Sequence, residues 1–398
     1  MKKLTIIALV VAVTAFFAVS ASANEWNLYG SARMATYWTS QDYGGDTEDQ
    51  WGRGSVDELQ WQMQVNSRVG ATVKGDQIEG RFEFSVTSDG GGGNVGARRL
   101  YGVWKFTEGW GLKVGKDYTP ITFFLSGQVF DNDQGLLNVG NAYGSRRAQI
   151  AVEGMAGPGM LKVALIDPTV DILTRIPVTG ITVESTTETK LPKLEASYDF
   201  KLSDTMSIQG FGGWQYFKQL QAITAQAAPG VTNQRSDSVT SYMFGVGADL
   251  NFGPMYVKPQ VSWYRNGASA GWLSEFVGLG NPVNPLTGDP ISQVPFIAQD
   301  GTIVDQDSLM MMLALGFKPT ESLGLEAGGG YLRTKDDNDT ANTYMEYYLQ
   351  AVWTLAKGVY LVPEVGYRDY GDLEPGGVAP DVDLGNLWYA GAKWQIDF

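Results

Sequence analysis

Three short runs in this chain match patterns that carry chemistry in other proteins. Residues 267–271 read G-x-S-x-G, a turn that presents a nucleophilic serine when a histidine base stands beside it. Residues 91–96 read G-x-G-x-x-G, which holds a phosphate only where a helix begins directly after it. Residues 336–339 read D-D-N-D, a candidate cation ligand that lacks the spacing and the closing glutamate of an EF-hand.

Composition argues against catalysis at all three runs. The 398-residue chain contains no histidine and no cysteine, so the commonest general base, the commonest transition-metal ligand and thiolate chemistry are absent. We therefore interpret 267–271 as a flexible external loop and 91–96 as a loose loop between two strands. Residues 336–339 are interpreted as solvated loop acid, with a weak lipopolysaccharide-bridging Ca²⁺ contact as the alternative. No cofactor and no resident metal are expected, and an enzyme is the least favoured class.

The first 23 residues have the pattern of a cleaved signal peptide. Lys2 and Lys3 precede an apolar run over residues 4–19, and Ala21, Ser22 and Ala23 provide small residues for cleavage. The apolar run is shorter than the roughly 20 residues that a spanning helix needs. Cleavage would remove two lysines and make the formal charge more negative than −14. Such an acidic chain, predicted to be exported as one domain over residues 24–398, is a poor partner for nucleic acid.

Residues 57–74 alternate between apolar and polar side chains over a length unusual for strands of globular sheets. The pattern predicts one long strand with an apolar face and a polar face, and transmembrane strands have this character. The apolar members are Leu59, Trp61, Met63, Val65, Val69, Ala71 and Val73.

The same alternation recurs along the chain and predicts sixteen strands with connections that are alternately short and long. Short connections include residues 75–76, 253–254 and 356–358, whereas residues 40–56, 168–189, 219–237 and 266–306 are long and polar. This rhythm is typical of an all-β fold, a transmembrane antiparallel up-and-down β-barrel, in which the first and last strands pair and abolish the sheet edge. The alternative is a secreted β-sandwich or β-helix, which would have shorter strands without that rhythm.

Three runs make the chain resemble the 16-stranded general porins of Gram-negative bacteria over its whole mature length. Residues 28–33 read L-Y-G-S-A-R, like a porin first strand, and residues 111–116 read G-L-K-V-G-K, like the strand before the porin third loop. The chain ends on Phe398, similar to the aromatic-terminated signal read by the outer-membrane assembly machinery. The small-residue leader end and the Trp-rich strands are most similar to the homotrimeric porins of sulfate-reducing bacteria.

The resemblance implies that a third loop, residues 118–145, folds into the lumen. This loop contains Phe123, Phe124 and Phe130, which would form a large apolar patch if it were solvated. In the lumen it would present Asp131 and Asp133 at the constriction. The polar faces of the predicted strands supply basic residues that would face these carboxylates and set up a transverse field: Arg33, Arg68, Arg81, Arg99, Lys113 and Arg147. Alternatively, these side chains pair with wall carboxylates such as Glu83 and Glu153 and are structural.

The function that the resemblance implies is passive diffusion of small hydrophilic solutes and ions across the outer membrane. The expected partners are outer-membrane lipid, lipopolysaccharide, the assembly machinery and two further copies in a homotrimer. A substrate-selective porin and an adhesive or structural outer-membrane barrel are the alternatives. Ion preference stays open at this point, because acidic loops favour cations and the basic wall favours anions.

Overall fold

The computed structural model describes residues 25–44, 54–86, 95–137, 139–168, 170, 173–174, 181–225, 232–273, 296–297, 302–374 and 381–398. The expected signal peptide and most of the glycine-rich run at 91–96 lie outside the described residues. Among the described residues, no helix is long and apolar enough to cross a membrane.

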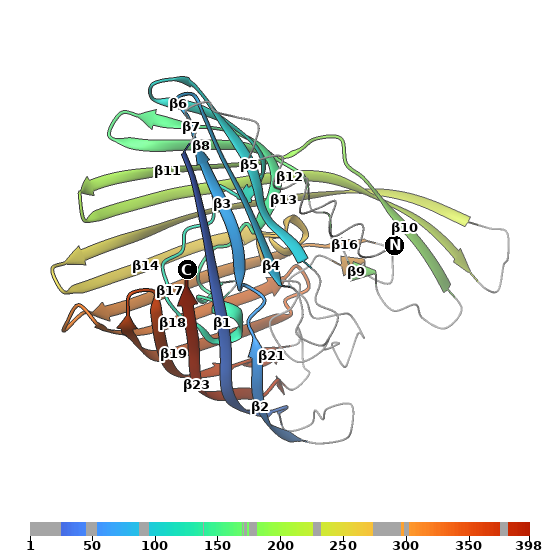
Figure 1. Cartoon of the computed structure of the whole chain (residues 1–398). Helices are drawn as coiled ribbons and strands as arrows, with labels where there is room; N and C mark the ends of the chain where they lie inside the picture. Colours follow the sequence, from blue (N-terminus) through green and yellow to red (C-terminus); the bar gives the residue numbers. More distant parts are fainter. Residues whose placement is uncertain are drawn as a thin grey trace, which may run out of the picture.

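Neighbouring strands pair antiparallel and form a closed barrel (Figure 1). The barrel has 16 strands if β2 and β3 are counted as one strand, and β10 and β11 as another. Pairing of β1 with β23 closes the barrel. The barrel strands are β1 (Glu25–Asp42), β2 (Ser55–Met63), β3 (Arg68–Lys74), β4 (Ile78–Val86), β5 (Val95–Thr107), β6 (Trp110–Tyr118), β7 (Arg146–Ala156), β8 (Gly159–Ile166), β10 (Ile181–Glu188), β11 (Lys193–Ser203), β12 (Met206–Ala225), β13 (Thr232–Phe252), β14 (Met255–Arg265), β17 (Gln306–Phe317), β18 (Leu323–Asp336), β19 (Ala341–Ala356), β20 (Val359–Asp369) and β23 (Asn386–Asp397).

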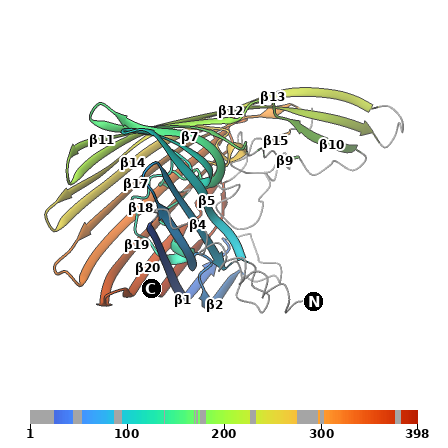
Figure 2. The same cartoon turned by 45° about the horizontal axis from the view of Figure 1, so that its top comes forward.

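The remaining elements lie in the connections between the barrel strands. β21 (Asp372–Glu374) pairs with β19, and β22 (Val382–Asp383) pairs with β21. The short strands β9 (Leu173–Thr174), β15 (Phe296–Ile297) and β16 (Ile303–Val304) form a small separate sheet. Two short helical turns are α2 (Phe130–Asp133) and η1 (Ala268–Ala270). β12, β13 and β10 reach beyond the other strands at one end of the barrel (Figure 2).

Because apolar and polar residues alternate along each strand, the apolar side chains lie on the outer face of the barrel, as predicted. On β17, Leu309, Met311, Leu313 and Leu315 are exposed, while Ser308, Met310, Met312 and Ala314 between them are buried. A large apolar surface cannot be left in water, so this exterior is suited to contact with lipid. Tight turns join strands at one end, where Gly157, Gly253 and Gly358 have positive φ angles.

The prediction of one continuous strand over residues 57–74 is wrong. β2 ends at Met63 and β3 begins at Arg68, and both pair with β1. The side chains keep their alternation across the gap, since Trp61 and Val69 are both exposed on the outer face. The intervening residues leave the ladder because they bond to the 118–145 loop instead, which the sequence pattern does not reveal.

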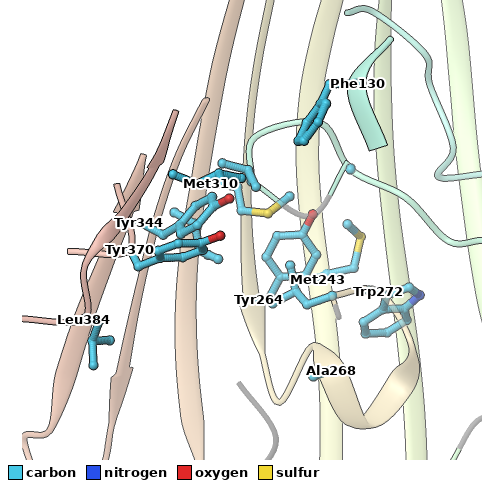
Figure 3. Packing of buried hydrophobic residues seen from close by; sticks show 14 of the residues in the cluster. Phe130, Met243, Tyr264, Ala268, Trp272, Met310, Tyr344, Tyr370 and Leu384 are labelled. Atoms are coloured by element: carbon cyan, nitrogen blue, oxygen red, sulfur yellow. The ribbon is translucent and has the colours of Figure 1, made fainter. Parts of the chain in front are cut away.

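The principal cluster of buried apolar residues is formed between barrel strands and the connections that pack on them. It includes Phe130 and Ile121 of the 118–145 loop, Trp272 and Leu273 after β14, and strand residues such as Tyr264 and Met310 (Figure 3). The strand residues of this cluster come from the polar face, opposite the exposed apolar exterior, and the connections supply the rest. The packed interior therefore depends on connections that fold back.

Candidate functional site

The 118–145 loop is fixed to β18 and β20 by buried carboxylates. Glu326 of β18 accepts a hydrogen bond from the Gly127 backbone N–H at 2.7 Å. Glu364 of β20 accepts from the N–H groups of Val129 and Phe130 at 2.7 and 3.1 Å. Buried carboxylates that accept backbone N–H groups replace the hydration that those groups lose, and they define where this loop lies.

The tip of the loop contains three consecutive residues in the left-handed region. Asp131, Asn132 and Asp133 have φ angles of 51°, 65° and 59°. Asp and Asn tolerate this region better than other side chains with a Cβ, so the D-N-D run suits the turn. The Asn132 side-chain oxygen accepts from the Val65 N–H at 2.9 Å, in the gap between β2 and β3.

An aromatic contact supports the same tip. The Phe130 ring stacks on Tyr389 of β23 with centroids 3.8 Å apart, and it meets the Tyr37 ring of β1 edge-on at 5.0 Å. The Arg368 guanidinium of β20 lies over the Phe130 ring, 4.9 Å from its centroid. Phe130, one of the apolar residues from which burial of the loop was predicted, is therefore enclosed by aromatic residues of the strands.

The two predicted loop carboxylates have different surroundings. Asp133 forms ion pairs with Arg33 of β1 and with Lys393 of β23, the latter at 2.9 Å, and it accepts from the Asn66 amide at 2.7 Å. The Asp131 side chain is 51% exposed and lies 3.4 Å from Arg368. Asp133 is thus neutralised by strand cations, whereas Asp131 faces solvent.

A cavity of about 490 Å³ lies between the loop and the wall formed by the first strands. The loop contributes Phe124, Gly127, Asn132 and Tyr143 among others. The basic residues that line the cavity are Arg33, Arg68, Arg98, Arg146 and Lys393, and we call them the basic wall. Asp133 is the acidic residue of the lining, and it is already paired.

Glu83 of β4 organises part of the basic wall. Its carboxylate lies 2.8 Å from Arg98, 3.0 Å from Arg81 and 3.8 Å from Arg68. One buried carboxylate cannot neutralise three guanidinium groups, so this group of side chains retains net positive charge. Arg98 joins it because a bulge in the pairing of β4 with β5 lets Arg98 and Arg99 both reach the polar face.

The remaining predicted site residues lie away from the cavity lining. Arg99 contacts Asp117 at 2.6 Å, and Lys113 contacts Asp117 and Glu153 at 3.1 and 2.9 Å. Arg81 also donates to the Tyr29 hydroxyl at 2.8 Å. Arg147 lies on β7 with its Nε buried and without a hydrogen-bond partner. Arg81, Arg99 and Lys113 thus pair with carboxylates on the barrel wall.

Sequence reasoning missed four basic residues near the loop: Arg98, Arg146, Arg368 and Lys393. Two of them stand beside predicted ones, in the pairs 98–99 and 146–147, so a double arginine was an available signal. A bulge or a strand start shifts such pairs, and strict alternation assigns one member to the wrong face.

The expectation of a flexible external loop at residues 267–271 is wrong. Ser269 is fully buried in η1, and its hydroxyl lies 2.8 Å from that of Ser241 on β13. Two acids of the D-D-N-D run are paired with basic residues: Arg265 of β14 donates to Asp337, and Asp339 pairs with Lys335. Within the described ranges, no group of three or more acidic side chains is arranged to hold a metal ion.

Comparison with known proteins finds similarity in fold. No family model matches the chain, and no curated protein matches it. The outer membrane channel DcaP of Acinetobacter baumannii is similar with a TM-score of 0.63 at 17% identity, over 95% of this chain and 99% of that one. The trimer form of OmpT, an outer membrane protein of Vibrio cholerae, has a TM-score of 0.56 at 14% identity over 94% and 100%. An anion-selective porin from Comamonas acidovorans has a TM-score of 0.52 at 14% identity over 94% and 100%.

Proposed function

We propose that this chain is an outer-membrane porin that lets small hydrophilic solutes and ions diffuse passively through its barrel. The observation that carries the proposal is the cavity between the 118–145 loop and the basic wall. A barrel with an apolar exterior and a charged, partly open interior is suited to hold a water path inside lipid. The loop forms the constriction of that path, and no catalytic step is assigned to the chain.

The charges around the cavity favour anions. Among the described residues, five basic side chains and one carboxylate line it, and that carboxylate, Asp133, is held by Arg33 and Lys393. Because a narrow passage focuses the field of its lining, the local positive charge outweighs the acidic balance of the whole chain at the constriction. The likeness in fold to an anion-selective porin agrees with this preference.

Assembly follows from the same proposal. A fold like that of the trimer form of OmpT supports a homotrimer. Phe398 directly follows β23 and exchanges backbone hydrogen bonds with Gly30 of β1, at 2.6 and 3.0 Å. This position suits a signal for the assembly machinery, with lipopolysaccharide around the assembled barrel and residues 1–23 as the leader. The closer relation to porins of sulfate-reducing bacteria rests on the leader and the Trp-rich strands alone.

Solute flux into liposomes tests the proposal. Vesicles that contain the folded protein should swell in small neutral sugars and faster in a monovalent organic anion than in a cation of matched size. Vesicles that contain a heat-unfolded sample serve as the control. A folded protein whose vesicles take up none of these solutes would contradict the channel and would favour a structural or adhesive barrel.

A further inference from the structure

A second connection also folds back onto the polar face of the strands. After β14, residues 266–273 turn through η1 and pack on β11, β12 and β13. The Gln215 amide of β12 donates to the Ser269 carbonyl at 3.4 Å, and the Lys193 ammonium of β11 donates to the Ala270 carbonyl at 2.8 Å. We call residues 266–273 the inner segment.

Trp272 is the anchor of the inner segment. Its indole N–H donates to Glu195 of β11 at 2.8 Å, and the Lys193 ammonium lies 3.3 Å from the same carboxylate. A Cβ on Gly213 of β12 would lie 2.5 Å from the Trp272 ring, so only a glycine leaves room for it. Trp272, Lys193 and Glu195 are all fully buried. The inner segment is therefore packed into the protein and does not lie on an exposed surface.

Burial differs sharply between the two sides of the barrel interior. On the basic wall, the Arg33 and Arg68 side chains are 12% and 20% exposed, and those of Arg98 and Lys393 are each 8% exposed. On β11 to β13, the inward polar residues Lys193, Glu195, Gln215 and Ser241 are 0% exposed. Polar side chains that line water keep contact with it, so the part of β11 to β13 beside the inner segment is covered more completely than the basic wall.

The inner segment and the 118–145 loop form one packed body. Ile121 and Ala142 of the loop share an apolar cluster with Trp272, Leu273 and Tyr264. Figure 3 shows the side chains of Trp272, Met243 and Tyr264 gathered beside the turn that holds Ala268. A Cβ on Gly144 of the loop would lie 3.2 Å from Glu195, which places the end of the loop beside the Trp272 anchor.

We infer that the inner segment is a second constriction element, which closes the β11 to β13 side of the lumen and confines solutes to the cavity beside the basic wall. Trp272, itself fully buried, holds the inner segment against this side of the barrel, and the Lys193–Glu195 pair positions Trp272. This inference rests on the proposed porin function and adds to it a residue that determines the size limit. The 118–145 loop reaches β13 near Gly247, whereas the inner segment covers Lys193, Gln215 and Ser241.

Replacement of the anchor tests the inference in planar bilayers. Trp272→Ala should release the inner segment from β11 to β13 and so enlarge the open cross-section. Single-channel conductance should then rise roughly two-fold, and larger polyethylene glycols should be admitted. The matched control is Trp263→Ala, which removes a tryptophan from the outer face of β14, where Trp263 packs on Tyr242 and Phe244. Equal conductance and size limit in folded Trp272→Ala and wild type would overturn the inference.

A cross-link tests the same placement without loss of packing. The chain has no cysteine, and the hydroxyls of Ser241 and Ser269 are 2.8 Å apart, so Ser241→Cys with Ser269→Cys should form a disulfide on mild oxidation. The oxidised channel should conduct like the reduced one. Free thiols after oxidation, or a conductance that falls on oxidation, would overturn the inference even if Trp272→Ala does not fold. A wild-type protein that folds but never conducts would instead refute the porin function.

Discussion

Asp133 and Arg33, which are 100 positions apart in the sequence, form an ion pair that joins the tip of the 118–145 loop to β1. Lys393 of β23 holds the other oxygen of the same carboxylate. β1 and β23 are the strands whose pairing closes the barrel, and Lys393 stands opposite Ala35 in that pairing. The loop tip is therefore secured at the seam between the two ends of the barrel, so its position depends on correct closure.

Asp133→Asn should shift the reversal potential in a KCl gradient further toward anions. The substitution keeps the shape of the side chain but leaves Arg33 and Lys393 without their counter-charge, so the anion-to-cation permeability ratio should rise roughly two-fold. Asp131→Asn should shift it in the same direction by less, because Asp131 lies outside the lining of the cavity. Asp76→Asn, in the exposed turn between β3 and β4, is the control for charge. An unchanged potential in Asp133→Asn would remove the loop tip from the constriction.

Neutralising the basic wall should have the opposite effect. Arg146 lines the cavity and donates a hydrogen bond to the Tyr118 hydroxyl at 3.2 Å. Since its described partner is a hydroxyl and not a carboxylate, Arg146→Gln removes a positive charge without leaving a carboxylate unpaired. The anion-to-cation permeability ratio should fall roughly two-fold. Lys201→Gln, at an exposed position near the end of β11, should leave the ratio unchanged. If both variants behave alike, the charge of the cavity lining does not determine selectivity.

Glu364 should control how firmly the 118–145 loop is held. Glu364→Leu keeps the volume but leaves the N–H groups of Val129 and Phe130 without their acceptor, at a cost of about 1–3 kcal/mol for each buried donor. We expect a lower urea midpoint, noisier single-channel currents and protease cleavage within residues 118–145. Glu364→Gln, which retains one acceptor oxygen, should lie between Glu364→Leu and wild type. A quiet, protease-resistant Glu364→Leu channel would show that the loop is held by other contacts.

Adjacent residues of β2 allow the two faces of the barrel to be compared. Trp61 is exposed on the outer face, and Gln62 is half-buried on the polar face. Trp61→Arg should lower the free energy of unfolding from lipid vesicles by up to about 4 kcal/mol, depending on its depth, while Gln62→Arg should cost much less. Equal losses would contradict the assignment of the apolar face to lipid.

Period-two alternation was sufficient to predict the barrel, its closure and the face that each strand turns outward. It failed where the chain leaves the ladder for long-range contacts. The gap between β2 and β3 exists because Val65 and Asn66 bond to the loop tip more than 60 positions away, and no local pattern encodes that. Residues 266–273 are buried for a similar reason, since they pack against distant segments. The bulge at Arg98 is a register shift in the pairing of β4 with β5, which strict alternation does not predict.

The type of site could be predicted from the sequence, but the identity of the residues that line it could be predicted only in part. Charged residues on polar faces and an apolar loop indicated a charged interior with a loop against it. Which arginines line the cavity depends on Glu83, Asp117 and Glu153, each of which holds particular cations on the wall. These pairings are set by barrel geometry and cannot be obtained from spacing along one strand.

Single-channel recording of the purified wild-type protein in a planar bilayer tests the central claim most directly. With KCl more concentrated on one side, the account predicts discrete open-channel steps and a reversal potential on the anion-selective side. Absence of steps from correctly folded protein would contradict the channel, and a cation-selective potential would contradict the basic wall as the constriction.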